Sequence, residues 1–166
     1  MIVIYQDVGG CHSSAVAANI HANKLPIDKV PTEKELLTLP TFDKLEKKDT
    51  AHLIYIGKDE FGSAVYTISR RYKPNMVLNP LTDMYKVLNG DTDGLYIINT
   101  DPTVNTLMKI GGFSSRQLHL VSFGRPIVTY GTLKAYNKIA DLVRQIKEQI
   151  RLDLEHKNRL ERNSYS

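Results

Sequence analysis

The opening of the chain constrains its fold most strongly, because a strand, a glycine turn and a helix follow one another without interruption. The apolar, β-branched run 2–5 is typical of a fully buried parallel strand. Glycines 9–10 permit a sharp turn, and the alanine-rich helix that follows has Ser13 or Ser14 as its expected N-cap. Such a loop directs backbone N–H groups and the positive end of the helix dipole toward an anion. We therefore expect an anion site at residues 9–14.

Two further apolar runs, 95–99 and 118–123, also read as strands that lead into helices. Alternating strands and helices favour a parallel sheet. Residues 52–69 read as a β-hairpin around a short Asp/Gly turn, which we expect at an edge of that sheet. The predicted fold is α/β: a three-layer, mostly parallel sheet with an added β-hairpin and a P-loop-like strand–loop–helix opening.

The second half of the chain is predicted to contain two helices separated by the third strand. Gly111-Gly112 is a signal for the end of the first of these helices, and the glycine and proline at 124–126 end the strand. An apolar stripe predicts the last helix from about Gly131 into the 150s. The charged segment 42–50 is expected to be exposed. A single domain would then span 1–155, followed by a polar tail at 156–166.

Composition limits the classes of partner. The net charge of +4 is spread along the chain, so it permits an anionic ligand but does not favour nucleic acid. Cys11 is the only cysteine, which excludes an intrachain disulfide and fits a cytoplasmic protein. No apolar run is long enough to cross a bilayer and no signal-peptide profile opens the chain, so we expect no membrane partner. A homo-oligomer is left open, and no cofactor or metal is assigned.

The loop supplies the main candidate residues. His12 is the candidate catalytic group, as a source of charge or of a transferable proton. The remaining candidates in the loop would bind the ligand, and they are Gly9, Gly10, Cys11, Ser13 and Ser14. The competing interpretation is a tight turn with a serine cap. The loop is neither a Walker A motif, since His12 stands where that motif needs lysine, nor a dinucleotide G-x-G-x-x-G motif.

Cys11 is a weaker candidate nucleophile. A helix N-terminus and a neighbouring histidine both lower the pKa of a thiol. A phosphatase-type C-x5-R loop would, however, need arginine at the position of Ala17. We favour a small, partly buried Cys11.

Candidates outside the loop complete the predicted site. Arg125 and Arg116 can clamp a phosphate or carboxylate in a bidentate fork, and Arg70-Arg71 is a further pair of this kind. Asp101 follows the second parallel strand and is a candidate for catalysis or magnesium binding, with an N-cap role as the alternative. Four segments are expected to converge at the carboxyl ends of the strands, where α/β sheets bind ligands: 9–14, 100–102, 123–126 and part of the hairpin.

The other titratable residues fit ordinary roles better. His21 is too far along the chain from His12 for a helical metal pair, and we expect a surface or core histidine. His52 and His119 flank predicted strands. Asp59-Glu60 suits a turn, with a magnesium site or general base as the alternative.

The chain resembles a small family of uncharacterised proteins from spore-forming Gram-positive bacteria. The resemblance lies in the GGCHSS loop, in the hairpin segment 56–66, and in Gly111-Gly112-Phe113 with the segment 124–128. It extends over nearly the whole chain to about residue 150. The family is a domain of unknown function, so the resemblance implies a bacterial cytoplasmic protein but no activity.

The sequence thus predicts a small α/β protein that binds a phosphorylated or nucleotide-like anion at the loop and carries out phosphoryl transfer or hydrolysis. The alternative is a non-enzymatic regulatory or interaction module that uses the long C-terminal helix.

Overall fold

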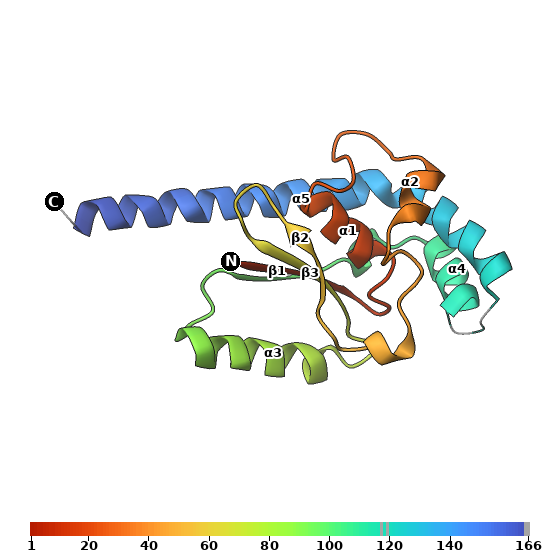
Figure 1. Ribbon diagram of the computed structural model, residues 1–166, viewed down its shortest axis with the longest axis horizontal. Coiled ribbons are helices and arrows are strands. Elements are labelled where there is room, and N and C mark those ends of the chain that lie inside the picture. Colours follow the sequence, from red (N-terminus) through yellow and green to blue (C-terminus); the bar gives the residue numbers. More distant parts are fainter. Residues whose placement is uncertain (117, 119, 165–166) are drawn as a thin grey trace.

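The computed structural model describes residues 1–116, 118 and 120–164 and is built around one four-stranded sheet (Figure 1). The strands are β1 (Ile2–Asp7), β2 (Ile54–Lys58), β3 (Ala64–Ser69) and β4 (Leu95–Asn99). The helices are α1 (Ser13–His21), α2 (Glu33–Thr38), α3 (Pro74–Asn89), α4 (Thr106–Arg116) and α5 (Val121–Ser164), with short 3-10 turns at Lys47–Asp49 and Asp101–Thr103.

The strand order is β2-β3-β1-β4, which makes β1 a central strand. It pairs in parallel with both neighbours, so that Ile4 lies opposite Tyr66 on β3 and Ile97 on β4. Only β2 is antiparallel, and it pairs with β3 at the edge of the sheet, which confirms the predicted hairpin and its place. The sheet is therefore mostly parallel, and the carboxyl ends of β1, β3 and β4 share one edge.

Helices lie on both sides of this sheet (Figure 1). Val3 and Tyr5 are fully buried in the main core with residues of α1 and α5. Because strand side chains alternate, Ile4 points to the opposite face, where α3 lies. None of the residues of α3 is fully buried, so this second layer is packed loosely.

The predicted third strand at 118–123 is wrong. Residues 121–123 are the first turn of α5, and His119 lies outside the described residues. The glycines read as terminators lie instead between two helices: a Cβ on Gly111 would meet the backbone nitrogen of Val128 at 2.3 Å, and one on Gly124 would meet that of Ser115 at the same distance. Glycine here permits close approach of α4 and α5, and the two helices pack as a hairpin.

The last helix begins ten residues earlier than Gly131 and continues to Ser164. Pro126 lies inside it without ending it. The predicted tail at 156–166 is thus helical as far as it is described. It projects beyond the sheet at the end of the molecule opposite the α4–α5 hairpin (Figure 1). No helix among the described residues is long and apolar enough to cross a membrane.

Candidate functional site

The loop after β1 is folded around the carboxylate of Asp7, a residue that the sequence did not single out. Asp7 Oδ1 accepts hydrogen bonds from the backbone N–H groups of Gly10 and of Gly9 (2.9 Å). Asp7 Oδ2 accepts from the Ser13 hydroxyl (2.7 Å) and from the Ser14 N–H (3.0 Å). The donors expected to receive an external anion are thus bonded to a carboxylate of the chain itself.

This arrangement corrects the predicted N-cap. The N-cap residue of α1 is His12, and its side chain makes no capping bond. Asp7 takes the capping role from six residues before the helix, because a carboxylate at a helix N-terminus is stabilised by the free N–H groups and the helix dipole. Gly10 makes the turn possible, since its φ is +72° and a Cβ would lie 2.6 Å from the backbone nitrogen of Ser69.

The second centre is the fully buried carboxylate of Asp43. His12 Nε2 lies 3.1 Å from its Oδ1, the Ser115 hydroxyl donates at 2.7 Å to Oδ2, and Arg125 Nε donates at 2.9 Å to the same oxygen. The Asp43 backbone carbonyl accepts from both Arg116 and Arg125 at 3.1 Å. Asp43, in the segment before β2, is therefore the residue at which the loop, α4 and α5 meet.

Three local features place Asp43 there. Its φ is +51°, a left-handed conformation that aspartate tolerates better than most side chains. Its N–H donates to the Cys11 carbonyl at 3.1 Å, which ties it to the loop. The close glycine packing of the α4–α5 hairpin then brings Ser115 and Arg125 to the same carboxylate.

The charges of His12 and Asp43 stabilise each other. Burial would lower the pKa of His12, but its neighbours Cys11 and Asp43 outweigh burial and raise that pKa to about 10. Burial would raise the pKa of Asp43, but hydrogen bonds from His12, Ser115 and Arg125 outweigh it and lower that pKa to about 2. At neutral pH His12 is therefore an imidazolium and Asp43 a carboxylate.

Cys11 lies beside this cluster. Its Sγ is 3.8 Å from His12 Nδ1 and 3.7 Å from Nε2, and the residue is 2% exposed. Gly112 on α4 packs against the imidazole of His12, because a Cβ at that position would lie 2.9 Å from His12 Cε1. The thiol is buried, and it contacts the imidazole of the cluster.

Asp101 is held apart from the Asp43 cluster. It forms an ion pair with Arg70, whose Nε also donates to Gln6. Burial raises the pKa of Asp101, against the opposing charge of Arg70. The carboxylate of Asp101 thus has a cationic partner within the fold. The Asp101 backbone N–H donates to Asn99 Oδ1 at 3.0 Å. Thr100 is the N-cap residue of the short turn Asp101–Thr103, but its side chain makes no capping bond.

His21 and Asp59 form part of a buried network rather than a site. His21 Nε2 lies 3.1 Å from Asp59 Oδ2, and its Nδ1 lies 2.8 Å from the Tyr5 hydroxyl. Burial lowers the pKa of His21, which favours the neutral ring as donor to Asp59 and acceptor from Tyr5. The other oxygen of Asp59 accepts from the backbone N–H of Ser63 at 2.7 Å, as expected for a turn residue. His21 is thus a core histidine.

The remaining candidates lie elsewhere. Glu60 pairs with Lys147 of α5 at 2.9 Å, and His52 is exposed beside the turn that precedes β2. Arg71 donates to the Thr50 hydroxyl at 3.0 Å. No group of three or more His, Cys, Asp or Glu side chains in the described residues has the geometry to hold a metal ion.

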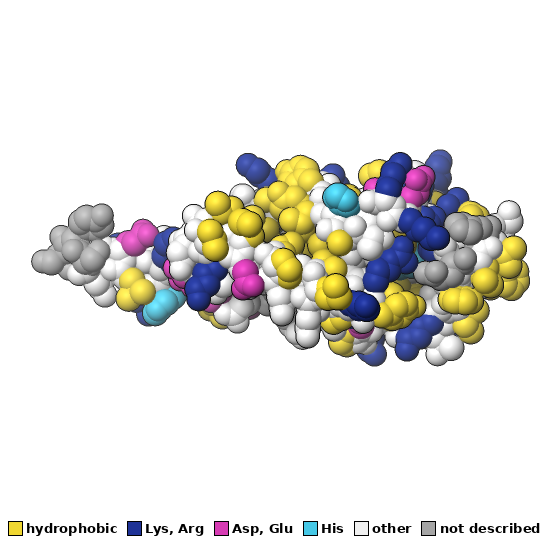
Figure 2. Space-filling view, turned by 90° about the horizontal axis from the view of Figure 1, so that it is seen from below, with side chains coloured by type: hydrophobic (Ala, Val, Ile, Leu, Met, Phe, Trp, Pro, Cys, Tyr) yellow, Lys and Arg dark blue, Asp and Glu magenta, His cyan; other side chains and the backbone are white. Residues whose placement is uncertain are grey.

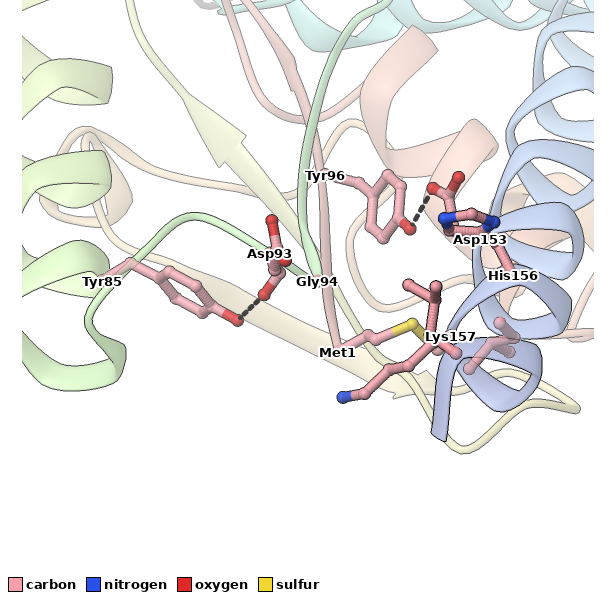
Figure 3. Close-up of a pocket in the computed structure, with 10 residues that line it drawn as sticks. Met1, Tyr85, Asp93, Gly94, Tyr96, Asp153, His156 and Lys157 are labelled. Carbon is pink, nitrogen blue, oxygen red and sulfur yellow. Dashed lines mark hydrogen bonds between the residues drawn. The ribbon is translucent and has the colours of Figure 1, made fainter. Parts of the chain in front are cut away.

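A cavity of 630 Å³ lies at the opposite edge of the sheet, between the start of β4 and the far part of α5 (Figure 3). Tyr96 donates to Asp153 at 2.6 Å and Tyr85 to the Asp93 carbonyl at 2.9 Å on its walls. Burial, with the hydrogen bond to Asp153, raises the pKa of Tyr96. None of the predicted site residues lines this cavity.

Sequence reasoning missed the two carboxylates that organise the site. Asp7 is the last residue of the buried strand β1, and ligands of α/β folds bind at the carboxyl ends of such strands. Asp43 gave no such signal, because it lies in a charged segment that we expected to be exposed. Ser115 was hidden by the wrong assignment of a helix end at Gly111-Gly112.

The comparisons with known proteins identify a family but no activity. Residues 2–148 match the model of a family described as protein of unknown function (DUF3189). No curated protein and no solved structure has significant similarity to the chain. Since the match extends over most of the sequence, the chain belongs to the DUF3189 family of proteins of unknown function.

Proposed function

We propose that this protein binds a small phosphorylated or nucleotide-like anion at the surface formed by His12, Arg116 and Arg125, beside the P-loop-like opening. The class of chemistry that suits these residues is phosphoryl transfer or hydrolysis. In line with the resemblance noted above, we place the protein in the cytoplasm of a spore-forming bacterium.

One observation carries the proposal: three cationic side chains from three separate elements converge on Asp43. His12 and Arg125 bond to its carboxylate, and Arg116 donates to its backbone carbonyl with Nε 4.0 Å from Oδ1. With His12 protonated, two positive charges are in excess at this point. The side chains of Arg116 and Arg125 are 24% and 35% exposed, so their outer N–H groups can reach a ligand. Planar guanidinium groups match phosphate oxygens in geometry and in charge.

The positive end of α1 adds to this field. Asp7 neutralises part of it by accepting from the loop, so Ser13 and Ser14 can contact an external anion only if that anion displaces Asp7. The arginine face needs no such displacement. We therefore assign the primary contacts to Arg116 and Arg125, and the loop supports them through His12.

The protonation state of His12 defines its role. A pKa of about 10 leaves the ring charged at neutral pH, which suits stabilisation of negative charge; it lies too far above neutral pH for efficient proton donation to a leaving group. It does not suit the role of a general base, which must be unprotonated before it acts. In the proposed chemistry His12 is thus an electrostatic group that stabilises negative charge on the ligand.

Thermal stabilisation by ligands tests the proposal. Inorganic phosphate, a sugar phosphate and a nucleotide are added separately to the wild type, to Arg125→Gln and to Arg151→Gln. Arg151 is the matched control, because its ion pairs with Glu148 and Glu155 lie on the exposed side of α5. A ligand at 100 times its Kd stabilises a protein by about 2.7 kcal/mol. We expect such a shift in the wild type and the control but not in Arg125→Gln; no shift with any anion would refute the proposal.

A second candidate is an interaction module that uses α5. The observation in its favour is that the end of this helix projects beyond the sheet, where Leu160 is 57% exposed (Figure 1). A partner held there would be lost from Leu160→Asp with the fold intact. Retention of every partner by that variant would remove this candidate.

A further inference from the structure

The tip of the α4–α5 hairpin carries a cluster of large apolar side chains that face solvent. Each of them is at least half exposed, and together we call them the hairpin tip: Ile110, Phe113, Leu118, Leu120 and Phe123. Backbone hydrogen bonds hold the turn together, from Leu118 to Phe113 and from Leu120 to Ser114. Scattered single apolar residues are normal on a protein surface, but a contiguous group marks an interaction site.

The hairpin that bears this tip has one sign of charge. Between Asp101 and Asp141 the sequence contains no acidic residue and five Lys or Arg residues. Of these, Lys109, Lys134 and Lys138 are exposed. Figure 2 shows basic and hydrophobic side chains side by side at this end of the molecule. The surface is thus both apolar and positively charged.

Shape distinguishes among possible occupants. The hairpin forms the extremity of the molecule, opposite the C-terminal end of α5, so the tip is convex (Figure 1). A convex apolar tip inserts into a soft surface, whereas a folded acidic protein would have to supply a matching apolar groove. A second copy of the same hairpin would be repelled by its equal charge. Apolar side chains that insert beside lysines that contact anionic headgroups are the pattern of proteins bound at a bilayer surface.

We infer that the hairpin tip docks on the surface of an anionic lipid bilayer, with the apolar side chains at the acyl boundary and Lys109, which directly precedes Ile110 on α4, at the headgroups. This goes beyond the proposed anion site and does not depend on it. It also revises the expectation of no membrane partner, which considered only segments long enough to span a bilayer.

Co-sedimentation with vesicles tests the inference. The full chain is mixed with vesicles of phosphatidylglycerol and phosphatidylcholine, and separately with vesicles of phosphatidylcholine alone. We expect binding to the first and not to the second. Exchange of both Phe113 and Phe123 for serine should weaken binding at least about tenfold, and Lys109→Gln should weaken it about fivefold.

The matched control lies on α3. Val87 and Leu88 are 77% and 76% exposed, so exchange of both for serine removes as much exposed apolar surface away from the tip, and vesicle binding should not change. Circular dichroism verifies that each variant is folded. Absence of binding to anionic vesicles would overturn the inference, as would equal binding by the tip variant and the wild type. Full competition by soluble polyglutamate would point to an acidic protein partner and would overturn it as well.

Binding of inorganic phosphate is measured in parallel on the same proteins. The tip variant should keep the phosphate affinity of the wild type, because Phe113 and Phe123 are exposed and the bonds to Asp43 come from other side chains. Loss of vesicle binding with phosphate binding retained supports the inference independently of the proposed function. A protein that binds vesicles through the tip but binds no phosphate would refute the proposed function alone.

Discussion

Replacement of Asp43 by asparagine is the sharpest perturbation of the site. Asparagine keeps the size of the side chain and tolerates the left-handed backbone at this position, so the change removes charge with little strain. The variant leaves three cationic side chains facing a neutral amide. It therefore tests whether the carboxylate holds the cluster together.

The structure sets the expected magnitude. The pKa of Asp43 falls from 3.8 to about 2, which corresponds to about 2 to 3 kcal/mol of stability at pH 7. The larger shift of His12 contains the same ion pair together with the effect of Cys11, so the two values are not added. Removing one partner of a buried pair costs about 3 to 5 kcal/mol, and the partial exposure of Arg125 reduces this. We expect Asp43→Asn to lose about 2 to 4 kcal/mol.

The pH dependence of this loss is also determined. His12 has a raised pKa in the folded state, so its contribution is complete below pH 6.5 and disappears as the pH rises through about 10. Asp43 has a lowered pKa, so its contribution is complete above pH 3.8 and disappears as the pH falls through about 2. The stability difference between wild type and variant should therefore be greatest between these limits, from about pH 4 to pH 6.5.

Urea unfolding at a series of pH values measures both quantities. Asp141→Asn is the control, because Asp141 pairs with Arg144 on the exposed surface, where such pairs contribute about 1 kcal/mol or less. A loss of less than about 1 kcal/mol in Asp43→Asn, or a difference that does not change with pH, would refute this view of the cluster.

Three further predictions concern the packing and the loop. Gly124→Ala should destabilise the fold by about 1 to 3 kcal/mol or more, because its Cβ would collide with the backbone of Ser115; Gly112→Ala meets only a side chain and should cost less in urea unfolding. Asp7→Ala leaves the loop N–H groups without their acceptor and should make the melting temperature rise more steeply with added phosphate than in the wild type. His21→Ala removes a buried partner of Asp59 and should cost about 1 to 3 kcal/mol or more in the same unfolding assay. Wild-type stability of Gly124→Ala or His21→Ala, or a wild-type response of Asp7→Ala to phosphate, would contradict the contact on which that prediction rests.

Local patterns in the sequence were sufficient to predict most strands of the sheet. β1, β4 and the hairpin of β2 and β3 have the apolar runs and the turn residues that define strands on their own. α3 likewise begins at a proline, Pro74, which suits the first turn of a helix, and it continues through Pro80. Each of these elements depends on a short stretch of chain, so the pattern and the structure agree.

The prediction was wrong where contacts between elements, and not the local sequence, determine the secondary structure. We expected Gly111 to end a helix and the glycine at 124 to end a strand, but both are contact points between α4 and α5, and only the presence of the partner helix distinguishes these roles. The apolar run 118–123 has the composition of a strand, but residues 121–123 form the first turn of α5. The site followed the same division: His12, Arg116 and Arg125 were identified by residue type, but Asp43, which brings them together, is defined by contacts far apart in the chain.

The central claim, that this surface binds a small phosphorylated anion, is tested most directly by calorimetric titration of inorganic phosphate into the wild type, Arg125→Gln and Arg151→Gln. We expect saturable binding to one site in the wild type and in Arg151→Gln, and loss of that binding in Arg125→Gln. Absence of binding to the wild type, or equal affinity in all three proteins, would contradict it.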